Sequence, residues 1–367
     1  MNPLVALWDE HRQAVWLDFI QRSLMADGGL ARLVASDGVR GVTSNPSIFK
    51  NAITGSDEYD EQIDEVLLAD PDATATEVYE ALAIRDIQAA ADVMRSVYDN
   101  SQGTDGFVSL EVSPELACDT SGTIVDARRL WAAVNRPNLM IKVPATAEGI
   151  PAIEELIAAG INVNATLMFS LADYEAVAMA FVCGIARCPE PARVASVASF
   201  FVSRVDSAVD KQLEAIGTPG ALGLRGKAAI ANACLAYRRF HEIFHGGPDF
   251  AASKDRGAQV QRPLWASTST KNPSYPDVLY VEELVGPETV NTIPSATLYA
   301  YRYHGRPRKA LAEGMERADE VMEGLAGVGI DLDAVTQKLQ VDGVKSFADA
   351  FQDLLLSLET KISSRRA

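Results

Sequence analysis

The stretch NLMIKVPATAEGIPAIEELIAAGINVNATLM, residues 138–168, contains one complete unit of a pattern that repeats along the chain. A short apolar run, Asn138–Pro144, precedes a segment with 3.6-residue periodicity, Ala147–Ala159, which ends at Gly160. A second apolar run, Ile161–Met168, follows. This order predicts a strand, a helix and a strand, which together form a βαβ unit of a parallel sheet.

The same alternation continues almost from end to end and predicts eight strands, the number that closes a (β/α)8 (TIM) barrel. The predicted strands are Ala14–Asp18, Gly38–Ser44, Gly106–Val112, Asn138–Pro144, Ile161–Met168, Val194–Val202, Arg262–Thr268 and Val290–Pro294. We expect additional helices at the N-terminus, after the second strand between Asn45 and about Thr74, and from Pro307 onward. The last region predicts two long helices that pack on the outer ring. Since no low-complexity linker or internal repeat divides the chain, we expect a single domain over residues 1–367.

The composition excludes several classes of protein. The chain has 367 residues, with 33 Lys and Arg against 50 Asp and Glu, and its formal net charge is −17. With 48% hydrophobic residues it is an ordinary globular protein rather than a disordered or collagen-like one. The acidic balance argues against nucleic acid or an anionic membrane as partner. It does not exclude a small phosphorylated metabolite, because a few local cations are enough to hold a phosphate.

Cysteine usage and the N-terminus indicate the cellular compartment. The four cysteines, at positions 118, 183, 188 and 234, are too few and too scattered for a disulfide framework and predict reduced thiols. The N-terminal segment has acidic residues where a signal peptide would carry its basic region. The longest apolar run, Ala176–Ala186, is about half as long as a membrane helix. We therefore expect a cytoplasmic protein.

Lys142 is the first candidate catalytic residue. Because side chains alternate across a strand, Ile141 and Val143 should face the outer helices and Lys142 should point into the barrel. Burial disfavours the charged form of a lysine and can leave a free amine, which is a nucleophile toward a carbonyl carbon. The alternative for an inward lysine is an inert buried ion pair with Asp18 or Glu111.

The same parity places other polar residues inward near the ends of their strands, where barrel enzymes carry their chemistry. These residues are Asp18, Thr43 and Asn45, Ser109 and Glu111, Asn162, Asn164 and Thr166, and Ser199. Taken singly, a residue such as Asn162 or Ser109 is more often a satisfied polar group of the core. Two carboxylates, a lysine and several hydroxyl and amide groups at one mouth together favour catalysis.

Two competing motifs point to other chemistry. HEIFH at residues 241–245 matches the zinc motif H-E-x-x-H. However, Gly246–Pro248 ends the helix directly afterwards, and Ala251 occupies the position of a third ligand. The stretch 220–228 resembles a P-loop, but Ala228 replaces the Ser or Thr that would hold magnesium. We therefore interpret the first motif as a pair of helix-end histidines and the second as a loop, and we expect no metal.

At the inward-facing residues the sequence resembles the transaldolases in their longer bacterial form, within the superfamily of class I Schiff-base aldolases. The resemblance runs in collinear order from near the N-terminus to at least Pro294. The motifs that carry it are WLDFIQR (16–22), GVTSNPSIF (41–49), SLEVSP (109–114), NLMIKVPAT (138–146), INVNATLMFS (161–170), SFFVSR (199–204) and RPLWASTSTKNPSY (262–275).

The resemblance implies a (β/α)8 barrel without metal or organic cofactor that transfers a dihydroxyacetone unit between sugar phosphates in the non-oxidative pentose phosphate pathway. The donor would be fructose 6-phosphate or sedoheptulose 7-phosphate, and the acceptor erythrose 4-phosphate or glyceraldehyde 3-phosphate. Lys142 matches the nucleophile that forms the Schiff base. Asp18 matches the residue that shuttles the proton of the C4 hydroxyl, and Glu111 and Thr166 match the pair that holds a water.

The resemblance also implies the residues that bind the substrate. Those that match groups around the three-carbon unit are Asn45, Asn164 and Ser199. Arg204 matches a phosphate-contacting arginine, which suits a bidentate grip on phosphate. Ser269 and Lys271 fall near the place where shorter members carry a serine and a second arginine, and Ser267 is the alternative for that serine.

Two other functions stay open. One is a lysine aldolase, similar to fructose-6-phosphate aldolase, that releases free dihydroxyacetone. The other is a barrel that binds a sugar phosphate or a protein without catalysis. Glu111 and the long insertions favour transfer, and the intact set of Lys142, Asp18 and Glu111 favours catalysis. The sequence does not distinguish a monomer from a homodimer.

Overall fold

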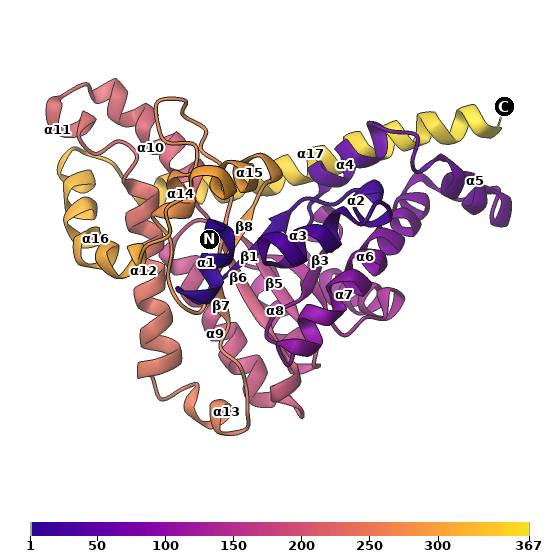
Figure 1. Ribbon diagram of the computed structural model, residues 1–367, viewed down its shortest axis with the longest axis horizontal. Coiled ribbons are helices and arrows are strands. Elements are labelled where there is room, and N and C mark those ends of the chain that lie inside the picture. The colour runs from indigo at the N-terminus through magenta and orange to yellow at the C-terminus, as the bar shows by residue number, and fades with distance from the viewer. Residues whose placement is uncertain (1, 367) are drawn as a thin grey trace.

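In the computed structural model, which describes residues 2–366, eight parallel strands close into one barrel (Figure 1). Each strand is hydrogen-bonded to the next in the sequence, and β8 is hydrogen-bonded to β1. The strands are β1 (Gln13–Asp18), β2 (Val39–Thr43), β3 (Phe107–Glu111), β4 (Leu139–Pro144), β5 (Val163–Met168), β6 (Ser196–Phe201), β7 (Arg262–Ala266) and β8 (Thr289–Ile293). The predicted (β/α)8 barrel is confirmed, and each predicted strand overlaps an observed one.

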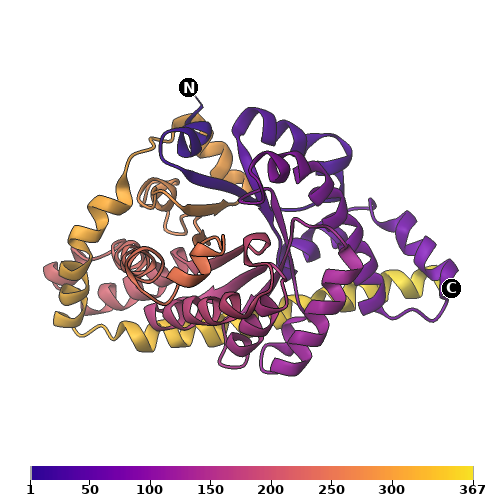
Figure 2. The ribbon, with the colours of Figure 1, turned by 90° about the horizontal axis from the view of Figure 1, so that it is seen from below.

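Helices surround this sheet, as the view in Figure 2 shows. Those before β4 are α1 (Pro3–Asp9), α2 (Arg22–Ala26), α3 (Gly29–Asp37), α4 (Pro46–Thr54), α5 (Asp60–Ala69), α6 (Ala75–Asn100), the 3₁₀ turn η1 (Pro114–Leu116) and α7 (Thr120–Val134). Those between β4 and β7 are α8 (Gly149–Ala158), α9 (Leu171–Arg187), η2 (Pro191–Arg193), α10 (Ser203–Ile216), α11 (Pro219–Leu222), α12 (Ala228–His241), the π-helical turn η3 (Glu242–Gly246) and α13 (Ala251–Asp255). The last are α14 (Leu279–Glu282), α15 (Ser295–His304), α16 (Ala310–Gly327) and α17 (Leu332–Arg366). Within residues 2–366, no helix combines the length and the apolar character needed to cross a bilayer.

Local sequence signals set several helix boundaries. Ser170 caps α9: its side chain accepts a hydrogen bond from the backbone N–H of Asp173, whose side chain accepts one in return from the backbone N–H of Ser170. Helix α8 begins at Gly149, later than predicted, where a Cβ would lie 1.9 Å from the carbonyl oxygen of Pro144. The chain therefore needs glycine where α8 starts beside the end of β4. The P-loop-like stretch 220–228 is the end of α11 and a loop into α12, as predicted.

The additional helices are present, but one of them lies elsewhere than predicted. Helices α4 and α5 follow β2 as expected, and α16 packs against α12 in the outer layer. Helix α17 does not join the outer ring. It passes over the carboxyl ends of the strands and continues beside α4, as the long yellow helix in Figure 1. The spacing of its apolar residues predicts a buried face, but it does not tell which surface that face covers.

Side-chain and backbone contacts fix α17 on the barrel. The side-chain amide of Gln340 donates to the carbonyl oxygen of Ala145 at 2.9 Å, directly after β4. Beside it, a Cβ on Gly343 would lie 3.3 Å from Leu167 of β5. The buried apolar side chains form one continuous cluster that includes those of α17. We propose on this ground that the whole chain, residues 1–367, is one domain.

Candidate active site

A cavity of about 160 Å³ opens at the carboxyl ends of the strands, beneath α17. Predicted site residues that line it are Asp18, Asn45, Lys142, Thr166, Ser199, Arg204, Ser269 and Lys271. Glu111 and Asn164 do not line this cavity, but each contacts a residue that does. The structure therefore brings the predicted residues together at the mouth where a (β/α)8 barrel places its catalytic groups.

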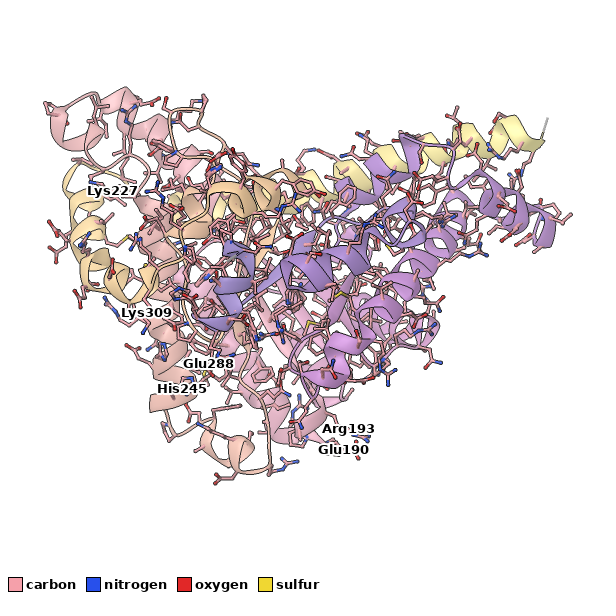
Figure 3. All side chains as sticks on the ribbon, in the orientation of Figure 1. Glu190, Arg193, Lys227, His245, Glu288 and Lys309 are labelled. Atoms are coloured by element: carbon pink, nitrogen blue, oxygen red, sulfur yellow. The ribbon has the colours of Figure 1, made fainter. Side chains whose placement is uncertain are left out.

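A larger hollow of about 620 Å³ lies at the opposite end of the barrel. Its charged lining residues, Glu190 and Arg193, are exposed and form an ion pair with each other, and Figure 3 shows both at the lower edge of the molecule. Asn162 also lines it, and its amide donates to the carbonyl oxygens of Pro137 and Leu139. Because each of these polar side chains already has a partner within the protein, we assign the chemistry to the smaller cavity.

Lys142 points into the barrel from β4, as predicted, and its side chain is only 5% exposed. The Nζ atom donates to Glu111 Oε2 at 3.3 Å and to the carbonyl oxygen of Ser44 at 3.2 Å. The amine is therefore not enclosed by apolar groups alone, and the ion-pair partner considered from the sequence is present. In the barrel register Lys142 stands between Glu111 of β3 and Asn164 of β5. A nucleophile and a carboxyl group that can exchange its proton thus sit on adjacent strands.

Glu111 and Thr166 flank Lys142 on the two neighbouring strands. Burial raises the pKa of Glu111, while the charge of Lys142 opposes this shift. Glu111 Oε1 and Thr166 Oγ1 are both buried, and neither has a hydrogen-bond partner within residues 2–366. Buried polar atoms normally have partners, so both atoms are available to hydrogen-bond a group from outside the chain.

Asp18 is held at the end of β1 by a chain of hydroxyl groups. Its Oδ1 accepts a hydrogen bond from Thr43 Oγ1 at 2.6 Å, and that hydroxyl lies 2.6 Å from Thr292 Oγ1 of β8. Burial raises the pKa of Asp18, whereas the Thr43 hydrogen bond and the charges of Lys142 and Lys271 lower it. A carboxyl group with a raised pKa is a stronger proton acceptor than an ordinary carboxylate, which suits it to general acid–base catalysis.

Two of the predicted binding residues already have partners in the fold. Asn164 is fully buried: its Oδ1 accepts from Ser199 Oγ at 2.6 Å and its amide donates to Ser109 Oγ at 3.1 Å. Asn45 is the N-cap of α4, where its Oδ1 accepts from the backbone N–H of Ile48 at 3.0 Å. Asn164 therefore orients Ser199, which does line the cavity, and Asn45 keeps its amide nitrogen for other contacts.

Two cations without acidic partners face the open side of the cavity. Arg204 lies in the first turn of α10, and Lys271 lies in the loop after β7. Within residues 2–366 neither forms an ion pair, although most arginines of this acidic chain do. Burial lowers the pKa of both, and Arg204 lowers that of Lys271 further. Because α10 also presents its positive end here, the arrangement favours an anion.

The structure does not choose between Ser267 and Ser269, because both line the cavity. Ser269 Oγ accepts from Lys271 Nζ at 2.5 Å, and Ser267 Oγ lies 3.0 Å from Ser203 Oγ. Ser267 adopts a φ of 55°, a left-handed conformation that is uncommon outside glycine. Such strain often occurs at binding sites, so both hydroxyls stay candidates.

Sequence reasoning missed three groups of the site. The carbonyl oxygen of Ser44 accepts from Lys142, but a backbone atom leaves no signal in a residue pattern. Thr292 extends the hydroxyl chain of Asp18, and its position late in a predicted strand was an available signal. Phe347 of α17 places its ring 5.4 Å from Lys142 Nζ, although its spacing indicated only burial.

The H-E-x-x-H motif lies at the end of α12, outside the barrel. His245 Nε2 lies 2.9 Å from Glu288 Oε2, and Figure 3 shows these two residues side by side. Glu242, the general base of a zinc hydrolase with this motif, pairs with Arg239 instead. Within residues 2–366, no group of three His, Cys, Asp or Glu side chains is arranged to hold a metal ion.

The site suits chemistry at a carbonyl carbon, because an amine nucleophile stands beside carboxyl groups that can move protons. The unpaired cations suit a phosphate on the same molecule. The fold and the site together define the class of (β/α)8 enzymes that form a Schiff base with phosphorylated carbonyl compounds. A family model described as "Transaldolase/Fructose-6-phosphate aldolase" matches residues 15–358. The chain belongs to this family.

Curated relatives match over nearly their whole length. A transaldolase of Thiobacillus denitrificans is 50% identical over 350 residues, covering 94% of this chain and 97% of the relative. A transaldolase of Frankia alni is also 50% identical and covers 93% of both chains. Transaldolase 1 of Streptomyces coelicolor is 46% identical over 96% of this chain and 93% of its own.

Proposed function

We propose that the chain is an enzyme that transfers a dihydroxyacetone unit from a ketose phosphate to an aldose phosphate in the non-oxidative pentose phosphate pathway. The donor is fructose 6-phosphate or sedoheptulose 7-phosphate, and the acceptor is erythrose 4-phosphate or glyceraldehyde 3-phosphate. Full-length relatives named transaldolase support this reaction. The observation that carries it is the buried amine of Lys142, held 3.3 Å from Glu111 at the barrel mouth.

The reaction begins with the amine of Lys142. Transfer of its proton to Glu111 leaves a free amine, which attacks the C2 carbonyl carbon of the ketose and forms a carbinolamine. The raised pKa of Glu111 supports this proton transfer. Loss of water gives an iminium ion, and Glu111 Oε1 and Thr166 Oγ1, which lack other partners within the described chain, hydrogen-bond the leaving water.

Asp18 acts on the next bond. Its carboxylate takes the proton of the C4 hydroxyl, the bond between C3 and C4 breaks, and the electron pair moves to the iminium nitrogen. The aldose phosphate leaves, and the three-carbon unit stays on Lys142 as an enamine. The incoming aldose then accepts the enamine carbon at its aldehyde, and Asp18 returns the proton to the new hydroxyl. Water adds to C2 of the resulting iminium ion, the C2–N bond breaks, and the new ketose phosphate leaves with the amine restored. The hydrogen bond from Thr43 holds the carboxylate in place for both steps.

The remaining residues orient the substrate. Asn45, Asn164 and Ser199 bind hydroxyl groups of the three-carbon unit, which is supported by the position of Asn45 and Ser199 in the cavity lining and by the hydrogen bond between Ser199 and Asn164. Arg204 and Lys271, with Ser267 or Ser269, are placed to bind the phosphate at the open side of the cavity. Since these cations lack carboxylate partners within the described chain, a phosphate neutralises them without breaking an ion pair.

Trapping with borohydride tests this function. The protein is incubated with fructose 6-phosphate and borohydride, and the modified peptide is identified by mass spectrometry. We expect a three-carbon adduct on Lys142. Lys142→Ala should give no adduct and no turnover while keeping its thermal unfolding profile, whereas Lys211→Ala, which removes an exposed lysine on α10, should behave like the wild type. Near-normal turnover of Lys142→Ala would exclude the mechanism.

The same experiment separates the two alternatives. A barrel that only binds sugar phosphates gives no adduct. A lysine aldolase gives the adduct but forms products from fructose 6-phosphate without any acceptor. The expected result is turnover that depends on erythrose 4-phosphate. The intact set of Lys142, Asp18 and Glu111 favours catalytic transfer over binding alone.

We further propose that the protein acts in the cytoplasm on sugar phosphates and has neither nucleic acid nor membrane as a partner. Its net charge of −17 supports the second part, since both polyanions would be repelled. The four cysteines are free thiols, and two of them, Cys118 and Cys183, are exposed, which suits a reducing compartment. Whether it acts as a monomer or a homodimer is decided by its mass in solution.

A further inference from the structure

Helix α17 covers the cavity at the amine of Lys142. Phe347, which lines the cavity and is 5% exposed, places its ring 5.4 Å from Lys142 Nζ. One turn earlier, Gly343 lets the helix approach Leu167, and Gln340 binds the carbonyl oxygen of Ala145. The ring is therefore held against the amine by contacts to the ends of β4 and β5.

Further contacts hold the distal half of α17 in place. Lys50 of α4 pairs with Asp353 at 2.8 Å. Lys361 and Arg365 both pair with Asp60 of α5, at 2.9 and 2.6 Å. Helices α4 and α5 follow the strand that carries Thr43, so the inserted pair anchors the helix that covers the site. Contacts before and after Phe347 along α17 thus hold the ring in position.

We propose that Phe347 determines the outcome of the enamine stage by keeping water from the three-carbon unit on Lys142. This inference rests on the proposed function and concerns the competition between transfer and release. For release, the enamine carbon C3 takes a proton to give an iminium ion. One water then adds to C2, the C2–N bond breaks, and free dihydroxyacetone leaves with the amine restored. Both steps need water or a solvent proton at the position that the ring covers.

The aromatic ring has a second effect on the same nitrogen. Its π face lies within the distance at which a cation is attracted by ring electrons, and the iminium nitrogen carries a positive charge while the enamine nitrogen does not. The ring therefore stabilises the iminium ion that precedes cleavage of C3–C4. An aliphatic side chain of similar volume excludes water but lacks this attraction, so the two effects can be separated.

The test compares Phe347→Ala and Phe347→Leu with the wild type. Dihydroxyacetone release from fructose 6-phosphate is measured without an acceptor, and transfer is measured with erythrose 4-phosphate. We expect the ratio of release to transfer to rise about tenfold in Phe347→Ala, the factor that 1.4 kcal/mol represents. We expect a smaller rise in Phe347→Leu, which keeps most of the cover. The intermediate that borohydride can still trap on Lys142, when the reagent is added at increasing times after the donor is removed, should also disappear faster in Phe347→Ala.

Leu356→Ala is the matched control. Leu356 is 59% exposed on the same helix, nine residues from Phe347, and it does not line the cavity. Truncating it leaves the buried face of α17 and the ring in place, so the ratio should stay near that of the wild type. An unchanged ratio in both Phe347 variants, or an equal rise in Leu356→Ala, would overturn the inference. Absence of an adduct on Lys142 in the wild type would instead refute the proposed function.

Discussion

Arg204 gives the sharpest prediction about substrate recognition. In the proposed complex its guanidinium binds two phosphate oxygens, and hydrogen bonds to a charged group contribute about 1.5 to 3 kcal/mol each. Arg204→Gln therefore removes about 3 kcal/mol at the lower bound, which is a loss of about 10²-fold in kcat/KM. Lys271 remains, and its pKa rises toward the ordinary value once Arg204 is gone, so binding is weakened rather than abolished.

The assay must separate the phosphate from the rest of the substrate. Steady-state kcat/KM is measured with glyceraldehyde 3-phosphate and with unphosphorylated glyceraldehyde as acceptors, each at saturating donor. Arg204→Gln should lose about 10²-fold with the first acceptor and little with the second. Arg204→Lys should recover part of the loss, because a point charge replaces the bidentate contact. The inhibition constant of inorganic phosphate should rise in parallel.

Lys211→Gln provides the control, since this exposed lysine lies on the same helix, α10. It removes one positive charge without touching the cavity, and it should change neither acceptor's kinetics by more than about twofold. The reasoning fails if Arg204→Gln loses activity equally with both acceptors, because the side chain would then support the fold of the site rather than the phosphate.

Two further predictions concern buried carboxyl groups. Glu111→Gln should lower kcat by about 10² to 10⁴ with a smaller effect on KM, because the amide cannot move the protons of carbinolamine formation; a loss confined to KM in steady-state kinetics would contradict this role. Asp206, whose pKa burial raises from 3.8 to about 6, should make the fold less stable as pH rises, since its protonated form is favoured in the folded chain. The stabilisation from the protonated carboxyl group is complete below pH 3.8 and is lost as the pH rises through about 6. The unfolding free energy of the wild type should therefore fall by about 1.5 kcal/mol between pH 5 and 8, relative to that of Asp206→Asn. Urea unfolding across this range measures it, and parallel pH profiles of the two proteins would refute it.

The barrel could be predicted from the sequence because apolar residues are spaced differently in strands and in helices. The 3.6-residue pattern of Ala147–Ala159 and the short apolar run Ile161–Met168 follow each other with little ambiguity, and parallel strands need the helices between them. Because successive side chains of a strand point to opposite faces, Lys142 and Thr166 were predicted to point inward, and both line the cavity. These are properties of neighbouring residues, so they can be predicted from the local sequence.

The parts that could not be predicted depend on contacts between distant segments. Apolar spacing in α17 indicated a buried face, but the partner of that face is Lys142, about 200 residues away in the chain. The pairing of Glu111 with Lys142 follows from the register of β3 against β4, which the sequence of either strand alone does not fix. The family resemblance implies that Asn164 contacts the substrate, and this stays a prediction; what the local sequence does not give is that the Asn164 side chain bonds to both Ser109 of β3 and Ser199 of β6.

These long-range contacts explain why the C-terminal helix belongs to the chemistry rather than to the outer layer. A Schiff base releases water when it forms and takes up water when it is hydrolysed, and the enamine between these two steps must be kept from water. Glu111 and Thr166 offer polar atoms on the two strands that flank Lys142, and Phe347 covers the amine with an apolar ring. In the proposed reaction water bonds to these polar atoms, while the ring keeps it from the enamine carbon. An open barrel mouth would admit water for hydrolysis but would not keep it from the enamine. A helix that crosses the mouth therefore favours transfer over release.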